Sequence, residues 1–233
     1  GPGTISFMRL YPINLDVRNR RCLVVGGGSV GARKARTLSD CGAVVVVVSP
    51  HVDQTVENLA RDGQILLERR SYRPSDLSRV FLAFAATDNP DVNRQIGEDA
   101  RRLSILCSIA DRPGDGDFTL PARVVQGDLV ITVSTSGKSP ALAKKLRKDL
   151  QAQFGPEYAL GLRLLGAVRE RLLANGHDPE SHKHLFRKLI EDGMIQHLKG
   201  DRIEAVNRIL KAALGPEYSF EDLMEPLPRR RRS

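Results

Sequence analysis

The chain contains no tryptophan, and aromatic residues make up only 5% of its 233 residues. Proteins that bind single-stranded nucleic acid usually stack its bases on aromatic side chains. The formal net charge is +8, but the run from Arg229 to Arg232 supplies four of these charges, which leaves about +4 for the rest of the chain. We therefore expect no nucleic-acid partner and, instead, an anionic small molecule as the ligand.

Cysteines and long apolar runs are also scarce. The three cysteines, Cys22, Cys41 and Cys107, are an odd number without C-x-x-C spacing, which argues against a disulfide framework or an iron–sulfur site and predicts buried free thiols. The longest apolar run, Ala43 to Val48, is far too short to cross a bilayer, and no cleavable signal precedes the first strand. We expect a soluble, cytoplasmic protein without a membrane partner.

A glycine-rich turn is the most informative motif that is present. The apolar run from Cys22 to Val25 leads into Gly26-x-Gly28-x-x-Gly31. Gly26 allows a tight bend, Gly28 lets the backbone approach a pyrophosphate, and Gly31 lets the next helix pack on the strand. A helix stop at Asp40 to Gly42 and a second apolar run complete a βαβ unit, so we predict dinucleotide binding. A plain strand-to-helix connection is the alternative.

The apolar runs continue in alternation with helical segments. Further strands are expected over 65–68, 80–86 and 104–110, and helices over 52–61 and 91–103. This alternation predicts a Rossmann-type α/β fold with a doubly wound parallel sheet over 8–117. Residues 1–7, ahead of Met8, look like vector-derived sequence and are left out of this prediction.

The pattern changes after residue 118. An antiparallel hairpin is expected around Gly127, over 123–133, within a small β-containing segment over 118–150. Ser139 and Pro140 are expected to open a helix, with Ser139 as its cap. A helical domain over 151–225 follows, in which Gly-Pro-Glu-Tyr occurs at 155–158 and 215–218 as a helix stop.

Ligands of open α/β sheets bind outside the carboxyl ends of the strands, so the residues after each apolar run are candidates. They are Ser29, Val30, Ser49, Pro50, His51, Thr87, Asp88 and Asp111. The Ser49-Pro50-His51 segment has neither a carboxylate for the adenosine ribose nor an arginine for a 2′-phosphate, so it does not decide between NAD and NADP. His51 is expected either to stack on the adenine or to cap the following helix.

Asp111 follows the apolar run from Cys107 to Ala110. A carboxylate at this point would be partly desolvated and suited to proton transfer. The alternative is that Asp111, Asp115 and Asp117 only form turns in a glycine-containing stretch.

The segment from Ser134 to Ser139 resembles the end of a P-loop, but Thr132 stands where that motif requires glycine. Its hydroxyls, together with Lys138 and a helix N-terminus, predict either a carboxylate-binding corner or a simple capped turn. The histidines of the helical region are His177, His182, His184 and His197. We expect the His182-x-His184 pair in a solvated loop and no metal site.

Five segments together resemble the siroheme synthase N-terminal family, the precorrin-2 dehydrogenases. They are Val24 to Ala35, Ala85 to Asn93, Cys107 to Asp111, Phe118 to Ala122 and Ile131 to Ala143. The resemblance implies a Rossmann domain, a central segment that forms a homodimer and a helical C-terminal domain. It also implies NAD-dependent oxidation of precorrin-2 to sirohydrochlorin, after which some members insert Fe²⁺ as a further substrate to give siroheme.

The resemblance also implies roles for individual residues. Ser29, Val30, Pro50 and His51 fall on cofactor-contacting positions, and Asp111 falls on the functional aspartate, which would take a proton while NAD takes a hydride. Thr135 falls where fused siroheme synthases have a serine beside the tetrapyrrole. Because the substrate is a polycarboxylate, its candidate contacts lie near the hairpin and the helix start. They are Arg123, Ser134, Thr135, Ser136, Lys138 and Lys144.

Two other function classes were compared with this one. A short-chain-type reductase needs a Tyr-x-x-x-Lys pair, and none of Tyr11, Tyr72, Tyr158 and Tyr218 has a lysine four residues later. A non-catalytic, NAD-sensing regulatory module stays as the alternative.

Overall fold

The structure is a computed structural model, and it describes residues 10–176 and 182–225. The features expected at residues 1–7, at Met8, at His177 and over Arg229 to Arg232 lie outside the described residues. The chain divides into two compact units, 1–120 and 121–233, and each is described by itself. Within the described ranges, no helix is both long enough and apolar enough to cross a membrane.

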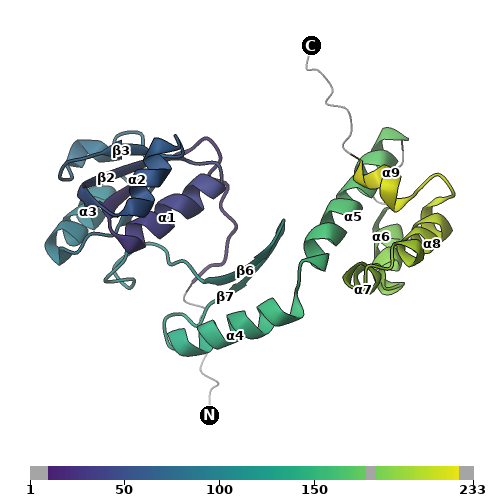
Figure 1. The fold of residues 1–233 in the computed structure, drawn as a ribbon. Coiled ribbons are helices and arrows are strands. Elements are labelled where there is room, and N and C mark those ends of the chain that lie inside the picture. The colour runs from purple at the N-terminus through teal and green to yellow at the C-terminus, as the bar shows by residue number, and fades with distance from the viewer. Residues whose placement is uncertain (1–9, 177–181, 226–233) are drawn as a thin grey trace, which may run out of the picture. The chain divides into compact units, whose positions relative to one another are not determined.

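Unit 1 is a five-stranded parallel sheet with helices on both faces (Figure 1). The strands lie in the order β3-β2-β1-β4-β5. Their bounds are β1 Arg21–Gly27, β2 Val44–Val52, β3 Leu66–Glu68, β4 Leu82–Ala85 and β5 Leu106–Ile109, and the helices are α1 Ser29–Asp40, α2 Gln54–Arg61, the 3₁₀ helix η1 Pro74–Leu77 and α3 Pro90–Arg102. The predicted doubly wound α/β fold is confirmed.

Both faces of this sheet are buried. On one face, Ala35 of α1 and Leu59 of α2 share a core cluster with Val24 of β1. On the other face, Ile96 of α3 shares a second cluster with Val25. Because neighbouring residues of a strand point to opposite faces, a strand buried on both sides is a continuous apolar run, which is why the sequence pattern was so clear.

Strand β2 is longer than the predicted Ala43–Val48. It runs to Val52, because its pairing with β1 resumes after an irregularity. Val25 pairs with Val48, the register then shifts, and Gly27 pairs with Val52. Pro50 lies within this irregularity, where its missing N–H breaks no regular ladder bond. Ser49, Pro50 and His51 are therefore part of the strand rather than residues beyond its end, which corrects the sequence-based prediction.

The helices after β2 and β4 begin at side-chain caps. Asp53 accepts a hydrogen bond from the Val56 N–H at 3.0 Å and starts α2, two residues later than predicted. Asn89 accepts one from the Asp91 N–H at 2.9 Å and starts α3. Both caps lie at the carboxyl edge of the sheet, so they also set the direction of the backbone there.

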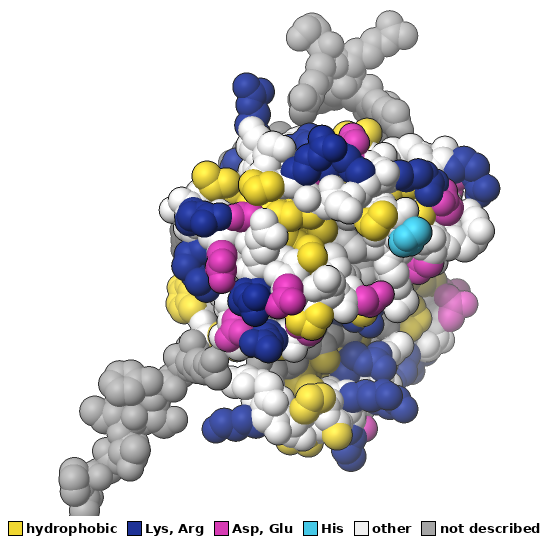
Figure 2. Space-filling view, turned by 90° about the vertical axis from the view of Figure 1, so that its left-hand side faces the viewer, with side chains coloured by type: hydrophobic (Ala, Val, Ile, Leu, Met, Phe, Trp, Pro, Cys, Tyr) yellow, Lys and Arg dark blue, Asp and Glu magenta, His cyan; other side chains and the backbone are white. Residues whose placement is uncertain are grey.

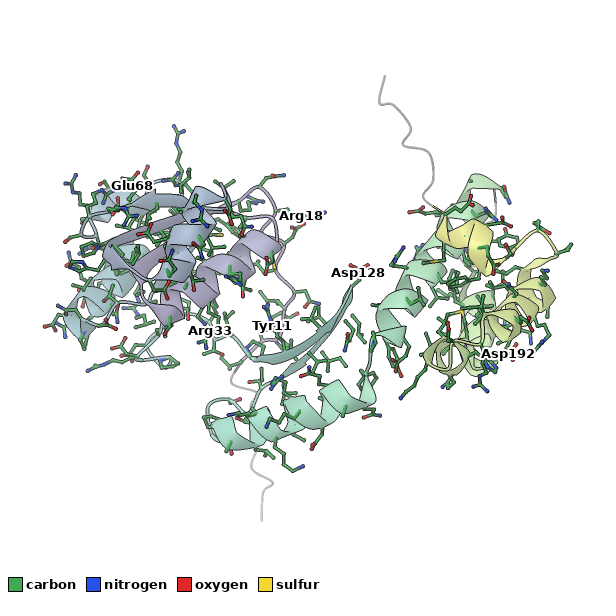
Figure 3. All side chains as sticks on the ribbon, in the orientation of Figure 1. Tyr11, Arg18, Arg33, Glu68, Asp128 and Asp192 are labelled. Atoms are coloured by element: carbon green, nitrogen blue, oxygen red, sulfur yellow. The ribbon has the colours of Figure 1, made fainter. Side chains whose placement is uncertain are left out.

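Unit 2 begins with the predicted hairpin, made of β6 Ala122–Gln126 and β7 Leu129–Val133, with Asp128 in its turn (Figure 3). Helix α4, Pro140–Gln153, follows, and the Ser139 hydroxyl caps it by accepting from the Leu142 N–H at 3.2 Å. Both predictions are confirmed.

The rest of unit 2 is helical, as predicted. It comprises α5 Glu157–Ala174, α6 His182–Glu191, α7 Met194–Lys199, α8 Ile203–Leu214 and α9 Phe220–Met224, around a core that includes Leu164, Leu189, Val206 and Tyr218. Gly155 follows α4 and Gly215 caps α8, so both copies of Gly-Pro-Glu-Tyr end a helix. The prediction for the His182-x-His184 pair is wrong, because His182 begins α6 and is buried.

Acidic and basic side chains alternate on the face of unit 1 that Figure 2 turns toward the viewer, with hydrophobic side chains between them. The chain has 36 Lys and Arg against 28 Asp and Glu. Because the two signs are mixed on this face, their fields largely cancel at a distance, and the excess charge does not form a uniform basic surface there.

The cysteines generate a prediction for thiol chemistry. Cys22 and Cys107 are buried, and burial raises the pKa of each thiol to about 11, whereas Cys41 is exposed after α1. The predicted burial thus holds for two of the three. Since the thiolate is the reactive form, we expect Ellman's reagent to label one thiol per native chain and three after unfolding. Cys41→Ser should remove the fast native reaction, and rapid labelling of three native thiols would contradict this burial pattern.

Candidate cofactor and substrate site

The glycine turn brings three backbone segments into close contact. Gly26 has a φ of +117°, and a Cβ added to it would lie 2.1 Å from the Ala86 carbonyl oxygen after β4. A Cβ on Gly31 in α1 would lie 2.0 Å from the Gly26 carbonyl oxygen. Side chains are excluded at both positions, so α1 packs directly on the end of β1 and begins at the carboxyl edge of the sheet.

Gly28 lies in open space instead. It is the N-cap residue of α1, with an ordinary φ of −78°, and a Cβ added to it would meet nothing within 4 Å. Ser29 and Val30 follow it as exposed residues of the first helical turn. The first N–H groups of a helix lack partners inside the helix and favour an anion, so this open corner fits the pyrophosphate of a dinucleotide.

A cavity of about 430 Å³ lies at this edge of unit 1. Six of the predicted cofactor residues line it: Gly26, Gly28, Ser49, Pro50, His51 and Thr87. The other three predicted cofactor residues are not part of the lining. They are Ser29, Val30 and Gly31, in the first turn of α1. The volume is typical of small-molecule clefts, which span roughly 300–1,000 Å³.

Other residues of this cavity were not predicted from the sequence. They are Ser71, Tyr72, Asn89, Val92 and Gln95, beside residues of β1, β2 and β4. Ser71 and Tyr72 follow β3, so the rule of strand ends could have found them had it also been applied to this short strand.

Tyr72 contributes a neutral phenol to the cavity wall. Its hydroxyl donates to the Asp99 carboxylate at 3.0 Å, and burial, with a smaller contribution from Asp76, raises the pKa of Tyr72 to about 12. The Arg70 guanidinium pairs with the Asp76 carboxylate of η1 at 2.8 Å. The Tyr72 ring is held in the cavity wall by Asp99, which lies outside the cavity lining.

His51 and Asp53 settle one alternative. His51 is exposed in β2, and the cap of α2 is Asp53, so the prediction that His51 could cap this helix is wrong. Asp53 directly follows β2, but its carboxylate is engaged with the Val56 N–H and is outside the cavity lining. The second strand still provides no residue that decides between NAD and NADP.

Asp111 lies after β5 and is connected through Asn93 of α3 to the cavity beside the glycine turn, the candidate cofactor cavity. The Asn93 amide nitrogen donates to Asp111 Oδ1 at 2.8 Å and to the Thr87 carbonyl oxygen at 3.0 Å. Asp111 is exposed, so the expected partial desolvation is wrong. It lines a second cavity, of about 470 Å³, together with Arg94, Arg101 and Arg112.

The other two aspartates of this stretch form structure. The Asp117 carboxylate accepts from the Cys107 N–H at 2.9 Å, and the Asp117 N–H donates to the Cys107 carbonyl oxygen at 2.8 Å. Asp115 forms an exposed ion pair with Arg112 at 3.9 Å. The turn-forming alternative therefore describes these two residues, whereas Asp111 is held by a buried amide.

The predicted substrate residues belong to unit 2. Ser134 accepts from the Ser136 N–H, and Thr135 accepts from the Ser139 N–H, both at 3.2 Å. The Lys138 N–H donates to the Thr135 carbonyl oxygen at 3.0 Å. These bonds form the capped turn ahead of α4, and its residues Ser134, Ser136 and Lys138 are exposed, as is Arg123 in β6 and Lys144 in α4.

Comparisons with known proteins agree with this architecture. Residues 13–122 match the family model "Putative NAD(P)-binding", and residues 126–153 match "Sirohaem biosynthesis protein central". These two segments, in this order, make the chain similar to the siroheme synthase N-terminal family. "SirC, precorrin-2 dehydrogenase" is a solved structure with a TM-score of 0.71 and 28% identity that covers 87% of this chain and 100% of its own.

Curated members of the siroheme synthase family are also similar. The siroheme synthase of Methylococcus capsulatus is 32% identical over 206 residues, and that of Pseudomonas putida is 34% identical over 206 residues. Each match covers 88% of this chain but 44% of the relative, so the chain spans less than half the length of these curated relatives.

The glycine turn generates a prediction that separates cofactor binding from folding. We expect Gly28→Asp to abolish NAD binding measured by calorimetry, because a carboxylate would meet the pyrophosphate. The free energy of unfolding should change by less than about 1 kcal/mol, since aspartate is itself a good N-cap residue. Gly26→Ala is the contrasting variant and should lower the melting temperature, because its Cβ would collide with the Ala86 carbonyl. Undiminished NAD affinity of Gly28→Asp would contradict the cofactor assignment.

Proposed function

We propose that this chain is an NAD-dependent dehydrogenase that oxidises precorrin-2 to sirohydrochlorin. The similarity to the siroheme synthase family and the dinucleotide-type turn support this function. The observation that carries it is the position of Asp111, a carboxylate held by Asn93 at the same sheet edge as the cofactor cavity. A base beside the place where a dinucleotide binds is what removal of a hydride and a proton requires.

The residues of the glycine turn would hold the cofactor. The N–H groups after Gly28 would face the pyrophosphate, and the cavity residues Ser49, Pro50, His51 and Thr87 would contact the rest of the molecule. When bound, NAD supplies the hydride acceptor. We propose NAD rather than NADP mainly from the family resemblance, to which the end of β2 adds only that it has no arginine to neutralise a 2′-phosphate. Arg33, which Figure 3 labels, and Arg36 are exposed cations on α1 to test for a 2′-phosphate contact.

Asp111 would take the proton that leaves the macrocycle in the same oxidation. Its Oδ1 atom accepts a hydrogen bond from the Asn93 amide nitrogen, which fixes the orientation of the carboxylate. The macrocycle thus loses one hydride and one proton, which balances the two-electron oxidation.

Unit 2 would bind the carboxylates of the substrate. The proposed contacts are Arg123, Ser134, Thr135, Ser136 and Lys138, with Lys144 beside them on α4. Lysine, arginine and hydroxyl groups at a helix N-terminus are suited to polycarboxylates. We further propose that Fe²⁺ is a second substrate, inserted into sirohydrochlorin with Asp111 accepting pyrrole protons.

Loss of the proposed base should affect the chemical step. We expect Asp111→Asn to lower kcat for precorrin-2 oxidation by roughly a hundredfold or more, because the amide cannot accept the proton. NAD affinity and KM for precorrin-2 should stay within a few fold, since the two side chains have nearly the same shape. The measurement is anaerobic NADH formation from precorrin-2, with NAD and NADP compared side by side.

The same assay tests the whole proposal. A protein that binds NAD without oxidising precorrin-2 would be the NAD-sensing module instead. Near-native kcat in Asp111→Asn would show that Asp111 is not the base and only forms the turn. Supplying sirohydrochlorin and Fe²⁺ to this variant shows whether chelation uses the same base.

We propose that the chain is a homodimer joined through the hairpin. Val125 and Val130 face each other across the two strands, on the same face as Arg123 and Thr132, and all four are exposed. The opposite face, which carries the buried Val124, is turned inward. A two-stranded sheet with two exposed valines on its open face is marginally stable in water as part of a monomer.

Substitution at this open face should separate the subunits. We expect light scattering at micromolar concentration to give a dimer mass for the wild type and a monomer mass for the Val125→Glu, Val130→Glu double variant, because two carboxylates would be buried in the interface. Leu173→Glu on α5 is the control, since this leucine is 43% exposed, similar to the 50% and 51% of the two valines. A monomeric wild type would contradict the proposal.

A further inference from the structure

The Asn93 side chain is buried between the two cavities. It lies in the second turn of α3, is 1% exposed, and is distinct from the cap of this helix, which is Asn89. Packing alone would be served equally well by an apolar residue of similar size, because a buried amide is unfavourable unless its hydrogen bonds are made. The hydrogen bonds of the Asn93 amide join Thr87 to Asp111.

The amide oxygen of Asn93 binds the backbone and side chain of Thr87. It accepts from the Thr87 N–H at 3.0 Å and from the Thr87 hydroxyl at 2.7 Å. The backbone N–H can only donate, so the atom opposite it must be the oxygen, and the orientation of the amide follows. The amide nitrogen therefore points the other way.

That nitrogen uses both of its hydrogens, on Asp111 Oδ1 at 2.8 Å and on the Thr87 carbonyl oxygen at 3.0 Å. All four hydrogen-bonding capacities of the amide are thus filled. The Asn93 side chain therefore binds Thr87 after β4 and also holds the Asp111 carboxylate after β5 in one orientation, with Oδ1 accepting its hydrogen bond.

The position of Asn93 relates the two cavities. Thr87 and Asn89 line the cofactor cavity, whereas Pro90 and Asp111 line the second cavity. The first turn of α3 thus forms part of the wall between them, and Asn93 is the polar link across it.

We propose that Asn93 is a positioning residue, which holds Asp111 oriented as the base and fixes it relative to Thr87 in the cofactor cavity. This inference rests on the proposed function, because it assigns Asn93 a role through Asp111. It adds a residue that acts on the reaction without contact to the substrate.

A double-mutant cycle in kcat tests this role. We expect Asn93→Ala to lower kcat for precorrin-2 oxidation by roughly tenfold or more, with KM for NAD within about threefold. In the Asp111→Asn background, the same substitution should change kcat by less than about twofold, because there is no longer a base to position. A merely structural residue would give losses that multiply, and that result would overturn the proposal.

Two further variants keep the test independent of stability. Asn207→Ala removes a half-buried, hydrogen-bonded amide in unit 2, which accepts from the Phe220 N–H at 2.6 Å and donates to Glu221. This variant should lower the melting temperature but leave kcat unchanged. Asn93→Asp keeps the shape and the acceptor toward Thr87 but places a second carboxylate against Asp111. It should lose at least as much kcat as Asn93→Ala, and native kcat in Asn93→Asp would contradict the proposal.

Side-chain amide NMR provides a readout that does not depend on turnover. The Asn93 amide protons should shift between the wild type and Asp111→Ala, and unchanged signals would overturn the proposed link. A wild type that oxidises precorrin-2 while the losses multiply contradicts the positioning role alone. A wild type without this oxidation contradicts the proposed function and the role together, so the two failures are distinguishable.

Discussion

The close contact of three backbone segments at Gly26 is the constraint on which the site depends. The carbonyl oxygens of Ala86 and Gly26 occupy the space that side chains at Gly26 and Gly31 would need. Only this contact lets α1 start directly above the end of β1, with its N–H groups exposed at Gly28. A wider spacing would separate the helix from the strand and remove the corner that suits a pyrophosphate.

The parallel sheet then brings chemistry from distant parts of the sequence to the same edge. Thr87 follows β4 and Asp111 follows β5, and the two strands are neighbours, so Asn93 of α3 can reach both. A buried amide with four filled hydrogen bonds is stiff, because any rotation would break several of them. The orientation of the exposed Asp111 is therefore set by a buried group and not by its own surroundings.

The sequence by itself determined the class of fold and the glycine turn. Strands buried on both faces appear as apolar runs, and the spacing of Gly26, Gly28 and Gly31 has a steric cause at each position, so both were readable without coordinates. The helix cap at Ser139 and the helix end before Gly155 could also be predicted from the sequence. These features depend on residues that are close together in the chain.

The tertiary structure decided what depends on partners far away in the sequence. Because β1 and β2 pair again after an irregularity, Ser49 to His51 are part of the strand, which differs from the prediction. His182 is buried in the helical unit, which also differs from the prediction. The contact of Asn93 with Asp111 spans 18 residues, and the Tyr72 hydroxyl bond to Asp99 spans 27. Sequence periodicity reports which residues are buried, but hydrogen bonds between elements depend on register and packing, which only the folded chain defines.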